Sequence, residues 1–289
     1  MEICKRLIAA GKPVRGLVRK TSDPVKVDGL KRMGVELVYG DLRDPASLAA
    51  ACQGMEAVIA CATRMTDMLP QPGDSIEATD QQGHLNAVAA AKAAGVRQYI
   101  YMSYSGSIDT GLSACPLTVA KRTVEAAVKA SGLTYTILRP SYFQEVWLSP
   151  AAGFDYPNAK ATLYGQGQNK ISWISVGDVA EFTAVSVGHP AARNAVIELG
   201  GPQAVSPLEA VTIFEEVGGR HFEITSVPVE ALQAQQAAAT DSISKSFSAL
   251  MLAYANGNVI DMRETLRKFS LTLTSVRDYA MRVAAPVPA

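Results

Sequence analysis

Strand-like and helix-like segments alternate along the first half of this chain, and this alternation limits the folds open to it more than any other feature. The expected strands lie at 14–20, 35–41, 56–63, 96–105 and 133–141, and the expected helices at 27–34, 44–54, 79–95 and 116–132. Strand, helix, strand repeated in this order is typical of βαβ units. The chain is therefore predicted to form an α/β fold, a doubly wound parallel sheet with helices on both faces.

Two of the expected strands, YIYMS and YTILR, are apolar without alternation, as expected when helices cover both faces of a sheet. After Pro140 the rhythm changes to a turn-rich, aromatic stretch, then a strand and helix within 171–188, and a mainly helical end with one strand at 221–228. We expect a nucleotide-binding part and a smaller, mainly helical C-terminal part. The first would hold 1–146 with 170–200 returning to it, and the second 147–169 and 201–289.

The balance of charge excludes several classes of function. The 289 residues include 27 Lys and Arg and 27 Asp and Glu, and no basic stripe is interleaved with aromatic residues, so nucleic-acid binding is not expected. No apolar run approaches the ~20 residues of a membrane span. The four cysteines form no CxxC or Cys/His cluster, which predicts no metal site and free thiols in a reducing cytoplasm.

The chain opens on a helix-patterned stretch, EICKRLIAAG, which Gly11 ends. In a doubly wound sheet, a strand and a glycine-rich turn precede the helix whose N-terminus holds a dinucleotide pyrophosphate. No GxGxxG follows a strand here, and the one GxG, Gly165 with Gly167, is typical of a hairpin-like turn. The phosphate-binding turn is thus missing from the expected pattern.

Other nucleotide-binding features are present at the ends of the first two expected strands. Arg19 and Lys20 end the first, where a cation favours the 2′-phosphate of NADP over NAD, unless they are simply a solvated basic loop. Asp41 and Leu42 close the second, where a carboxylate accepts a hydrogen bond from an adenine amine. The alternative for Asp41 is a helix cap, although Asp44 is better placed for that role.

Four stretches carry a resemblance to a known family. VRGLVRKTSD, GVELVYGDLRDPASLAAACQGMEAVIACAT, AAKAAGVRQYIYMS and VEAAVKASGLTYTILRPSYFQE resemble the NmrA-like branch of the atypical short-chain dehydrogenases/reductases. This resemblance implies an NAD(P)H-binding Rossmann domain. Some members reduce quinones or plant phenolics, and others are redox-sensing binding proteins. It also implies that the central strand and its GxxGxxG loop are lacking, through a misassigned start codon, a truncated chain, or a natural variant that has lost the dinucleotide.

The catalytic signature departs from that of the superfamily. Its usual Tyr-x-x-x-Lys has Leu117 in the tyrosine position, whereas Lys121 matches the family lysine that serves as general acid or base. The alternative role for Lys121 is an ion pair with Glu125 one turn on. Tyr104, after the strand YIYMS, is a candidate replacement for the lost phenol. Ser103 ends that strand, where the superfamily often has a catalytic serine.

Further candidates follow the other strands. Ala62 and Thr63 end the strand AVIACAT, near the expected cofactor ribose or pyrophosphate. The resemblance places Pro140 and Phe143 beside the nicotinamide and Tyr142, Phe143 and Trp147 beside the substrate. Plain core packing is the alternative for the aromatic residues.

The sequence as a whole indicates an NADP-preferring reductase, with NAD as the alternative cofactor. The expected substrate is a small quinone, carbonyl or conjugated aromatic compound. The alternative is a non-catalytic sensor or scaffold of the same fold that acts through a protein partner or as a homo-oligomer. An epimerase of the extended superfamily is a third interpretation, against which Leu117 argues.

Overall fold

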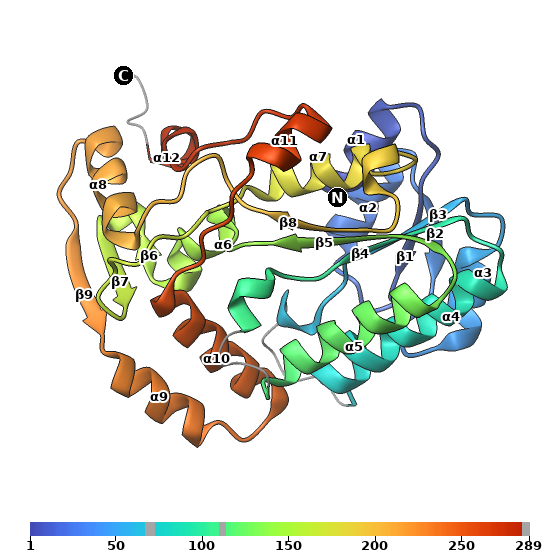
Figure 1. The fold of residues 1–289 in the computed structure, drawn as a ribbon, viewed down its shortest axis with the longest axis horizontal. Coiled ribbons are helices and arrows are strands. Elements are labelled where there is room, and N and C mark those ends of the chain that lie inside the picture. Colours follow the sequence, from blue (N-terminus) through green and yellow to red (C-terminus); the bar gives the residue numbers. More distant parts are fainter. Residues whose placement is uncertain (67–72, 110–113, 285–289) are drawn as a thin grey trace. The chain divides into compact units, whose positions relative to one another are not determined.

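The computed structural model describes residues 1–66, 73–109 and 114–284 (Figure 1). The chain divides into two compact units, and each is interleaved along the sequence. Unit 1 comprises Met1–Ser103, Pro116–Leu138 and Ala180–Ile197. Unit 2 comprises Tyr104–Cys115, Arg139–Val179 and Glu198–Ala289.

The strands of the doubly wound part form two separate sheets. A parallel pair joins β1 (Arg15–Val18) to β2 (Glu36–Tyr39). A second sheet has the order β3 (Ala57–Ala60), β4 (Gln98–Met102), β5 (Thr134–Pro140) and β8 (Ala195–Leu199). The pairs β3–β4 and β4–β5 are parallel. Within the described residues no strand joins β1 to β3, where a doubly wound sheet has its central strand.

Helices cover both faces of these strands, which confirms the expected doubly wound arrangement. Figure 1 shows α3 (Pro45–Cys52), α4 (His84–Ala93) and α5 (Pro116–Ala130) on one side of the sheet, and α1 (Glu2–Ala9) with α7 (Val176–Val185) on the other. Helix α2 (Pro24–Arg32) links β1 to β2. Asp23 and Asp44 cap α2 and α3 through their carboxylates, each followed by a proline in the first turn, so the capping expected of Asp44 is confirmed.

The segment expected as one helix at 79–95 begins instead with a π-helix over Ile76–Gly83, and α4 follows directly. The Ser75 hydroxyl caps it by accepting a hydrogen bond from the Ala78 amide at 3.1 Å. Most π-helical segments in proteins are single-turn bulges, which are frequent at functional sites. At eight residues, this π-helix is longer than such a bulge.

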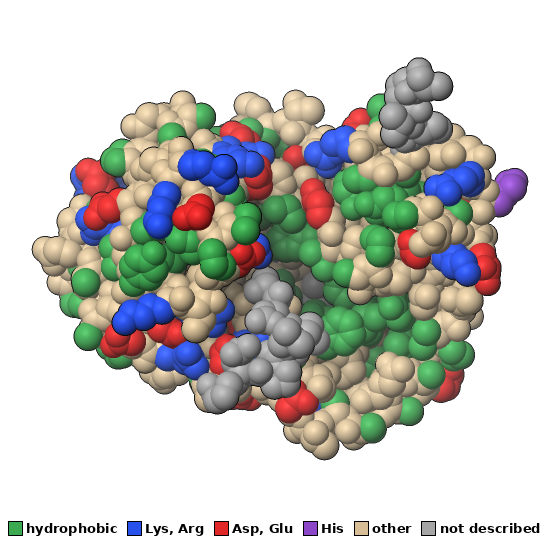
Figure 2. All heavy atoms as spheres, turned by 180° about the vertical axis from the view of Figure 1, so that it is seen from behind, with side chains coloured by type: hydrophobic (Ala, Val, Ile, Leu, Met, Phe, Trp, Pro, Cys, Tyr) green, Lys and Arg blue, Asp and Glu red, His purple; other side chains and the backbone are tan. Residues whose placement is uncertain are grey.

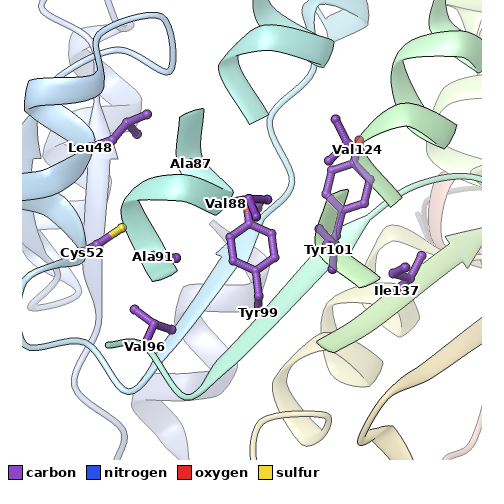
Figure 3. Close-up of a cluster of buried hydrophobic side chains, with 12 residues drawn as sticks. Leu48, Cys52, Ala87, Val88, Ala91, Val96, Tyr99, Tyr101, Val124 and Ile137 are labelled. Atoms are coloured by element: carbon purple, nitrogen blue, oxygen red, sulfur yellow. The ribbon is translucent and has the colours of Figure 1, made fainter. Parts of the chain in front are cut away.

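The core of unit 1 lies between β4 and the helices α3, α4 and α5. Tyr99, Ile100 and Tyr101 are completely buried, so both faces of β4 are covered, as the lack of alternation predicts. Figure 3 shows the Tyr99 and Tyr101 rings on the same side of the strand, close to Val88 of α4 and Val124 of α5. Residues two apart in a strand share a face, which explains this paired placement.

Unit 2 contains a small sheet and most of the remaining helices. Its sheet has the order β6 (Phe154–Asp155), β7 (Lys160–Tyr164) and β9 (Glu223–Val227), with β7 and β9 parallel. Its helices are α6 (Gln144–Trp147), α8 (Pro207–Gly218), α9 (Val229–Ala238), α10 (Ser242–Asn256), α11 (Arg263–Phe269) and α12 (Val276–Val283). In place of the strand expected at the start of 171–188, the described residues form isolated bridges, from Ile171 to Val205 and to Asn258 and from Ile174 to Phe143.

Charged side chains of both signs are interspersed over the face shown in Figure 2, in keeping with the zero net charge. None of the helices in the described ranges combines the length and hydrophobicity that a membrane crossing needs. All four cysteines lie in these ranges and are free thiols. The described residues also contain no cluster of His, Cys, Asp and Glu suited to a metal ion.

Candidate functional site

Unit 1 contains a pocket of about 250 Å³ at the carboxyl ends of three parallel strands. Its walls come from Leu17 of β1, from the residues after β1, β2 and β3, and from two residues of the segment around the start of the π-helix. The lining residues are Leu17, Arg19, Ser22, Gly40, Asp41, Leu42, Cys61, Ala62, Thr63, Arg64, Asp74 and Thr79. Five of the residues predicted to bind a cofactor, Arg19, Asp41, Leu42, Ala62 and Thr63, therefore line one pocket.

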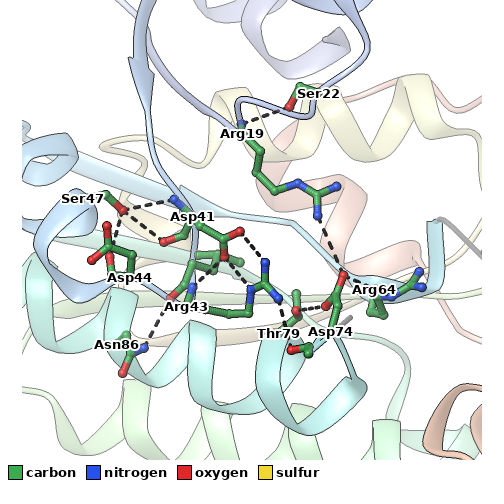
Figure 4. Close-up of polar contacts among 12 residues, drawn as sticks. Arg19, Ser22, Asp41, Arg43, Asp44, Ser47, Arg64, Asp74, Thr79 and Asn86 are labelled. Atoms are coloured by element: carbon green, nitrogen blue, oxygen red, sulfur yellow. Dashed lines mark hydrogen bonds and ion pairs between the residues drawn. The ribbon is translucent and has the colours of Figure 1, made fainter. Parts of the chain in front are cut away.

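The buried carboxylate of Asp74 pairs with two arginines of this pocket, Arg19 and Arg64 (Figure 4). Its Oδ2 lies 3.2 Å from Arg64 Nε and 3.8 Å from Arg19 Nη1, and the Thr79 hydroxyl donates to its Oδ1. The Asp74 and Arg64 side chains are almost completely buried, whereas the Arg19 side chain is 47% exposed. The Arg19 guanidinium therefore remains accessible to an anion in the pocket.

The Asp41 carboxylate is hydrogen-bonded by Arg43, two residues on. Arg43 donates to both carboxylate oxygens of Asp41 at 2.9 Å, and these hydrogen bonds lower the pKa of Asp41. Asp41 is thus charged at neutral pH, and its remaining lone pairs can accept a further hydrogen bond. Lys20, the other basic residue predicted at this end, is exposed and is not part of the pocket lining.

A second group of polar side chains surrounds Lys121, which α5 carries into the interior of unit 1. The Lys121 ammonium donates to the Met102 carbonyl at 3.2 Å, lies 3.7 Å from Asp80 Oδ1, and stands 5.3 Å from the centre of the Tyr101 ring. Its side chain is 6% exposed. Burial lowers the pKa of Lys121, and the Asp80 carboxylate opposes this effect.

His84, on α4, belongs to the same buried group. Its Nε2 lies 2.8 Å from the Ala62 carbonyl, which can only accept, so Nε2 carries the proton and Nδ1 is the unprotonated nitrogen. Burial, together with the Lys121 ammonium, lowers the pKa of His84 to about 4. His84 is therefore a neutral imidazole that ties α4 to the pocket lining at Ala62.

The alternative role for Lys121, an ion pair with Glu125, is wrong. Glu125 accepts from the Ser103 hydroxyl and from Arg122 Nη1, both at 2.6 Å, and Arg122 also donates to Ser103 at 2.9 Å. Lys121 pairs with Asp80 instead, because the two residues face each other from α5 and the π-helix. Ser103, a predicted catalytic residue, is buried and committed to this separate group.

The remaining candidates belong to unit 2. Tyr104 is buried, and the Pro140 carbonyl accepts from the Ser105 amide at 3.0 Å. The Tyr142 hydroxyl donates to the Leu250 carbonyl at 3.3 Å, and its ring meets that of Trp147 edge to face at 4.9 Å.

Trp147 is also packed within unit 2. It stacks on Tyr254 at 5.3 Å, and Phe143 forms a bridge with Ile174. Within unit 2, Tyr142 and Trp147 therefore pack in an aromatic cluster, the alternative that the sequence left open for them. The predicted catalytic and substrate residues are divided between the two units.

Three charged residues at these sites were not singled out from the sequence: Arg64, Asp74 and Asp80. Arg64 directly follows Thr63 at the end of an expected strand, which is a usable signal in a parallel sheet. Asp80 lies near the start of an expected helix, where a carboxylate normally suggests only an exposed first turn. Its complete burial depends on the π-helix, which no sequence pattern here indicates.

Parallel strands covered by helices on both faces, with a pocket at the carboxyl ends of β1, β2 and β3, define a Rossmann-like α/β protein. The chain belongs to the NmrA-like family, whose sequence profile matches residues 2–280. The resemblance inferred from the sequence is therefore confirmed.

Individual relatives are distant. The chain is 28% identical to an NAD(P)H azoreductase of Xenophilus azovorans, over 82% of this chain and 75% of that protein. It is 26% identical to the photosystem II assembly factor Ycf39 of Trieres chinensis, over 80% of this chain and 70% of that protein. It spans only 56% of the length of one chloroplastic relative from Arabidopsis thaliana.

Among solved structures, the NADPH complex of the quinone oxidoreductase QOR2 of Escherichia coli has the same fold. The TM-score is 0.76 with 21% identity, covering 98% of this chain and 95% of that chain.

Proposed function

We propose that this protein is an NADPH-dependent reductase of small quinones, carbonyl compounds or conjugated aromatic compounds. The observation that carries the proposal is the pocket of unit 1, where the accessible Arg19 lies beside Asp41, Leu42 and Thr63 at the ends of parallel strands. Ligands of open α/β sheets bind at the carboxyl ends of the strands. The relative named as an NAD(P)H azoreductase supports the class of reaction.

The described residues fit the adenosine end of NADP. A pocket of about 250 Å³ lies just below the range of about 300–1,000 Å³ usual for ligand sites, so it suits one end of a dinucleotide rather than the whole molecule. Arg19 would bind the 2′-phosphate, and Asp41 with the Leu42 backbone would face the adenine. No glycine-rich turn is among the residues that line this pocket.

In this proposal the protein supplies one proton to the substrate, and Lys121 is its source. NADPH, when bound, would supply a hydride, that is, one hydrogen nucleus with two electrons. A quinone that accepts this hydride needs one further proton to become a hydroquinone. The Lys121 ammonium donates that proton to the developing oxyanion and is reprotonated from water. A buried lysine suits this role because burial brings its pKa closer to neutral pH.

Cofactor preference is tested by binding titrations with NADPH and NADH, using intrinsic fluorescence or calorimetry. Arg19→Ala should weaken NADPH binding by about 10- to 100-fold, the value of one charge-assisted contact of about 1.5–3 kcal/mol, and leave NADH binding unchanged. Lys20→Ala is the matched control, because Lys20 is the adjacent cation outside the pocket lining. Equal effects of Arg19→Ala on both nucleotides, or none, would refute the assignment.

The proton donor is tested by turnover of a quinone panel with NADPH. Lys121→Met keeps the length of the side chain and removes its proton, and it should lower kcat by about 100-fold or more. Unchanged turnover of any accepted quinone would remove Lys121 from the mechanism.

A second candidate function is a non-catalytic NADP-binding scaffold that acts through a protein partner or a second copy. It is favoured by Leu117, which stands where the superfamily has its catalytic tyrosine, and by the relative named as an assembly factor. Steady NADPH oxidation with any quinone counts against it. The four free thiols fit a reducing compartment, and we propose the cytoplasm for either function.

A further inference from the structure

Asp80 is a completely buried carboxylate that the proposed reaction does not itself require. Its Oδ2 accepts a hydrogen bond from the backbone amide of Arg64 at 2.9 Å. Its Oδ1 has no hydrogen-bond partner within the described residues and lies 3.7 Å from the Lys121 ammonium. Burying a carboxylate is costly unless it is paired, so Lys121 is the group that makes this burial tolerable.

The ammonium group of Lys121 is enclosed by elements of unit 1 that carry few charges. The groups that act on it electrostatically are the Asp80 carboxylate from the π-helix, the His84 imidazole from α4, the Cys61 thiol after β3, the Tyr101 ring of β4 and, on its own helix, the Arg122 guanidinium. His84 is neutral, and Arg122 repels the ammonium. Of these groups, Asp80 supplies the negative charge.

We propose that Asp80 is a positioning residue for Lys121, whose ammonium group it keeps charged and fixed at the carboxyl end of β4. The carboxylate is itself fixed, because the Arg64 amide holds one oxygen while the other faces Lys121. The Met102 carbonyl accepts a hydrogen bond from one of the three ammonium N–H groups. The inference rests on the proposed function of Lys121 as a proton donor, and it explains how a buried lysine keeps its proton until the substrate needs it.

The π-helix carries Asp80 to its position opposite Lys121. It begins at Ile76 and ends at Gly83, so Asp80 lies in its interior and not in an exposed first turn. Gly83 allows the end of this helix to approach Leu42, since a Cβ at that position would lie 2.9 Å from Leu42 Cβ. The same segment therefore contacts the nucleotide pocket at Leu42 and the lysine at Asp80.

The direct test is the titration of Lys121, followed by NMR of protein carrying ¹³C-labelled lysine and assigned with Lys121→Met. Asp80→Asn preserves an acceptor for the Arg64 amide and removes the charge. It should move the titration midpoint of Lys121 to lower pH by about 1 to 3 pH units. Asp44→Asn is the matched control, because Asp44 caps α3 and an asparagine caps equally well. An unchanged midpoint in Asp80→Asn overturns the proposal.

The pH dependence of quinone reduction gives the second readout. If the ammonium is the proton donor, the rate falls as pH rises through its titration, and Asp80→Asn should move this fall to lower pH by the same amount. A shifted midpoint without any NADPH-dependent turnover would support the pairing and refute the reductase. Turnover that depends on Lys121, with an unshifted midpoint in Asp80→Asn, would support the reductase and refute the pairing.

Asp80→Asn leaves a buried ammonium unpaired, so loss of the fold is an outcome to plan for. In that event the double variant Asp80→Asn with Lys121→Met, which lacks both charges, is compared with Lys121→Met in urea unfolding. Recovery of the fold in the double variant supports a direct pairing. If the double variant remains unfolded while Lys121→Met folds, the Asp80 carboxylate is needed for a reason other than its pairing with Lys121, and the proposal is wrong.

Discussion

His84 should make unit 1 less stable as the pH falls below neutral. The imidazole is completely buried, and burial next to the Lys121 ammonium lowers its pKa to about 4 from 6.5. Because the folded pKa is depressed, the unfolded chain binds a proton first as pH falls. The contribution of His84 is therefore fully present above about pH 6.5 and is lost as pH falls toward 4.

The size of the effect follows from the same two values. At 1.36 kcal/mol per pH unit, the free energy of unfolding should fall by about 2 kcal/mol at pH 5 and by about 3 kcal/mol at pH 4, relative to pH 7.5. His84→Gln removes the titration and leaves an amide that can donate to the Ala62 carbonyl. The variant should lose about 2 kcal/mol less than the native protein between pH 7.5 and pH 5.

Urea unfolding followed by circular dichroism at pH 7.5 and pH 5 measures this difference. Amide hydrogen exchange of β4 assigns the transition to unit 1. His221→Gln is the control, because the His221 side chain is fully exposed and lies in unit 2. Equal losses of stability in the native protein and in His84→Gln would refute the reasoning and show that other groups cause the acid sensitivity.

Two further predictions concern unit 2. Ser206→Ala removes the capping box with Glu209 at the start of α8 and should cost about 1 kcal/mol in urea unfolding. Gly201→Ala should abolish soluble expression, because a Cβ there would lie 1.8 Å from the Trp173 carbonyl oxygen. Gly219→Ala, at a positive φ of 66° but with open space around it, should cost only about 1–2 kcal/mol and so separates backbone strain from collision.

The fold of unit 1 could be predicted because local signals and burial agree there. The apolar runs at 96–105 and 133–141 coincide with β4 and β5, and the capping residue Asp44 marks the start of α3. The prediction of a strand within 171–188 was wrong, since Ile171 and Ile174 make only isolated bridges. Its apolar pattern reflects burial, which a strand and an irregular buried segment share.

The site was predictable where residues follow strands and not where a helix changes its pitch. Arg19 and Thr63 were found because the ends of parallel strands meet at one edge of a sheet. Asp80 was missed because a π-helix shifts which side of the segment faces inward, and no residue type marks that change. Lys121 was found only through the family resemblance, and its pairing with Asp80 depends on contacts between segments 41 positions apart, from 80 to 121.

The division of the parallel strands into two sheets would give a ligand bound in the pocket of unit 1 a mechanical role. Strands β1 and β2 share ladder hydrogen bonds only with each other among the described strands, so no backbone ladder joins this pair to the four-stranded sheet there. The pocket takes Arg19 and Asp41 from the ends of that pair, and Ala62 and Thr63 from the end of β3. A ligand that contacts both groups would link the two sheets. Each tenfold rise in its concentration above the Kd would add about 1.4 kcal/mol to the free energy needed to separate them.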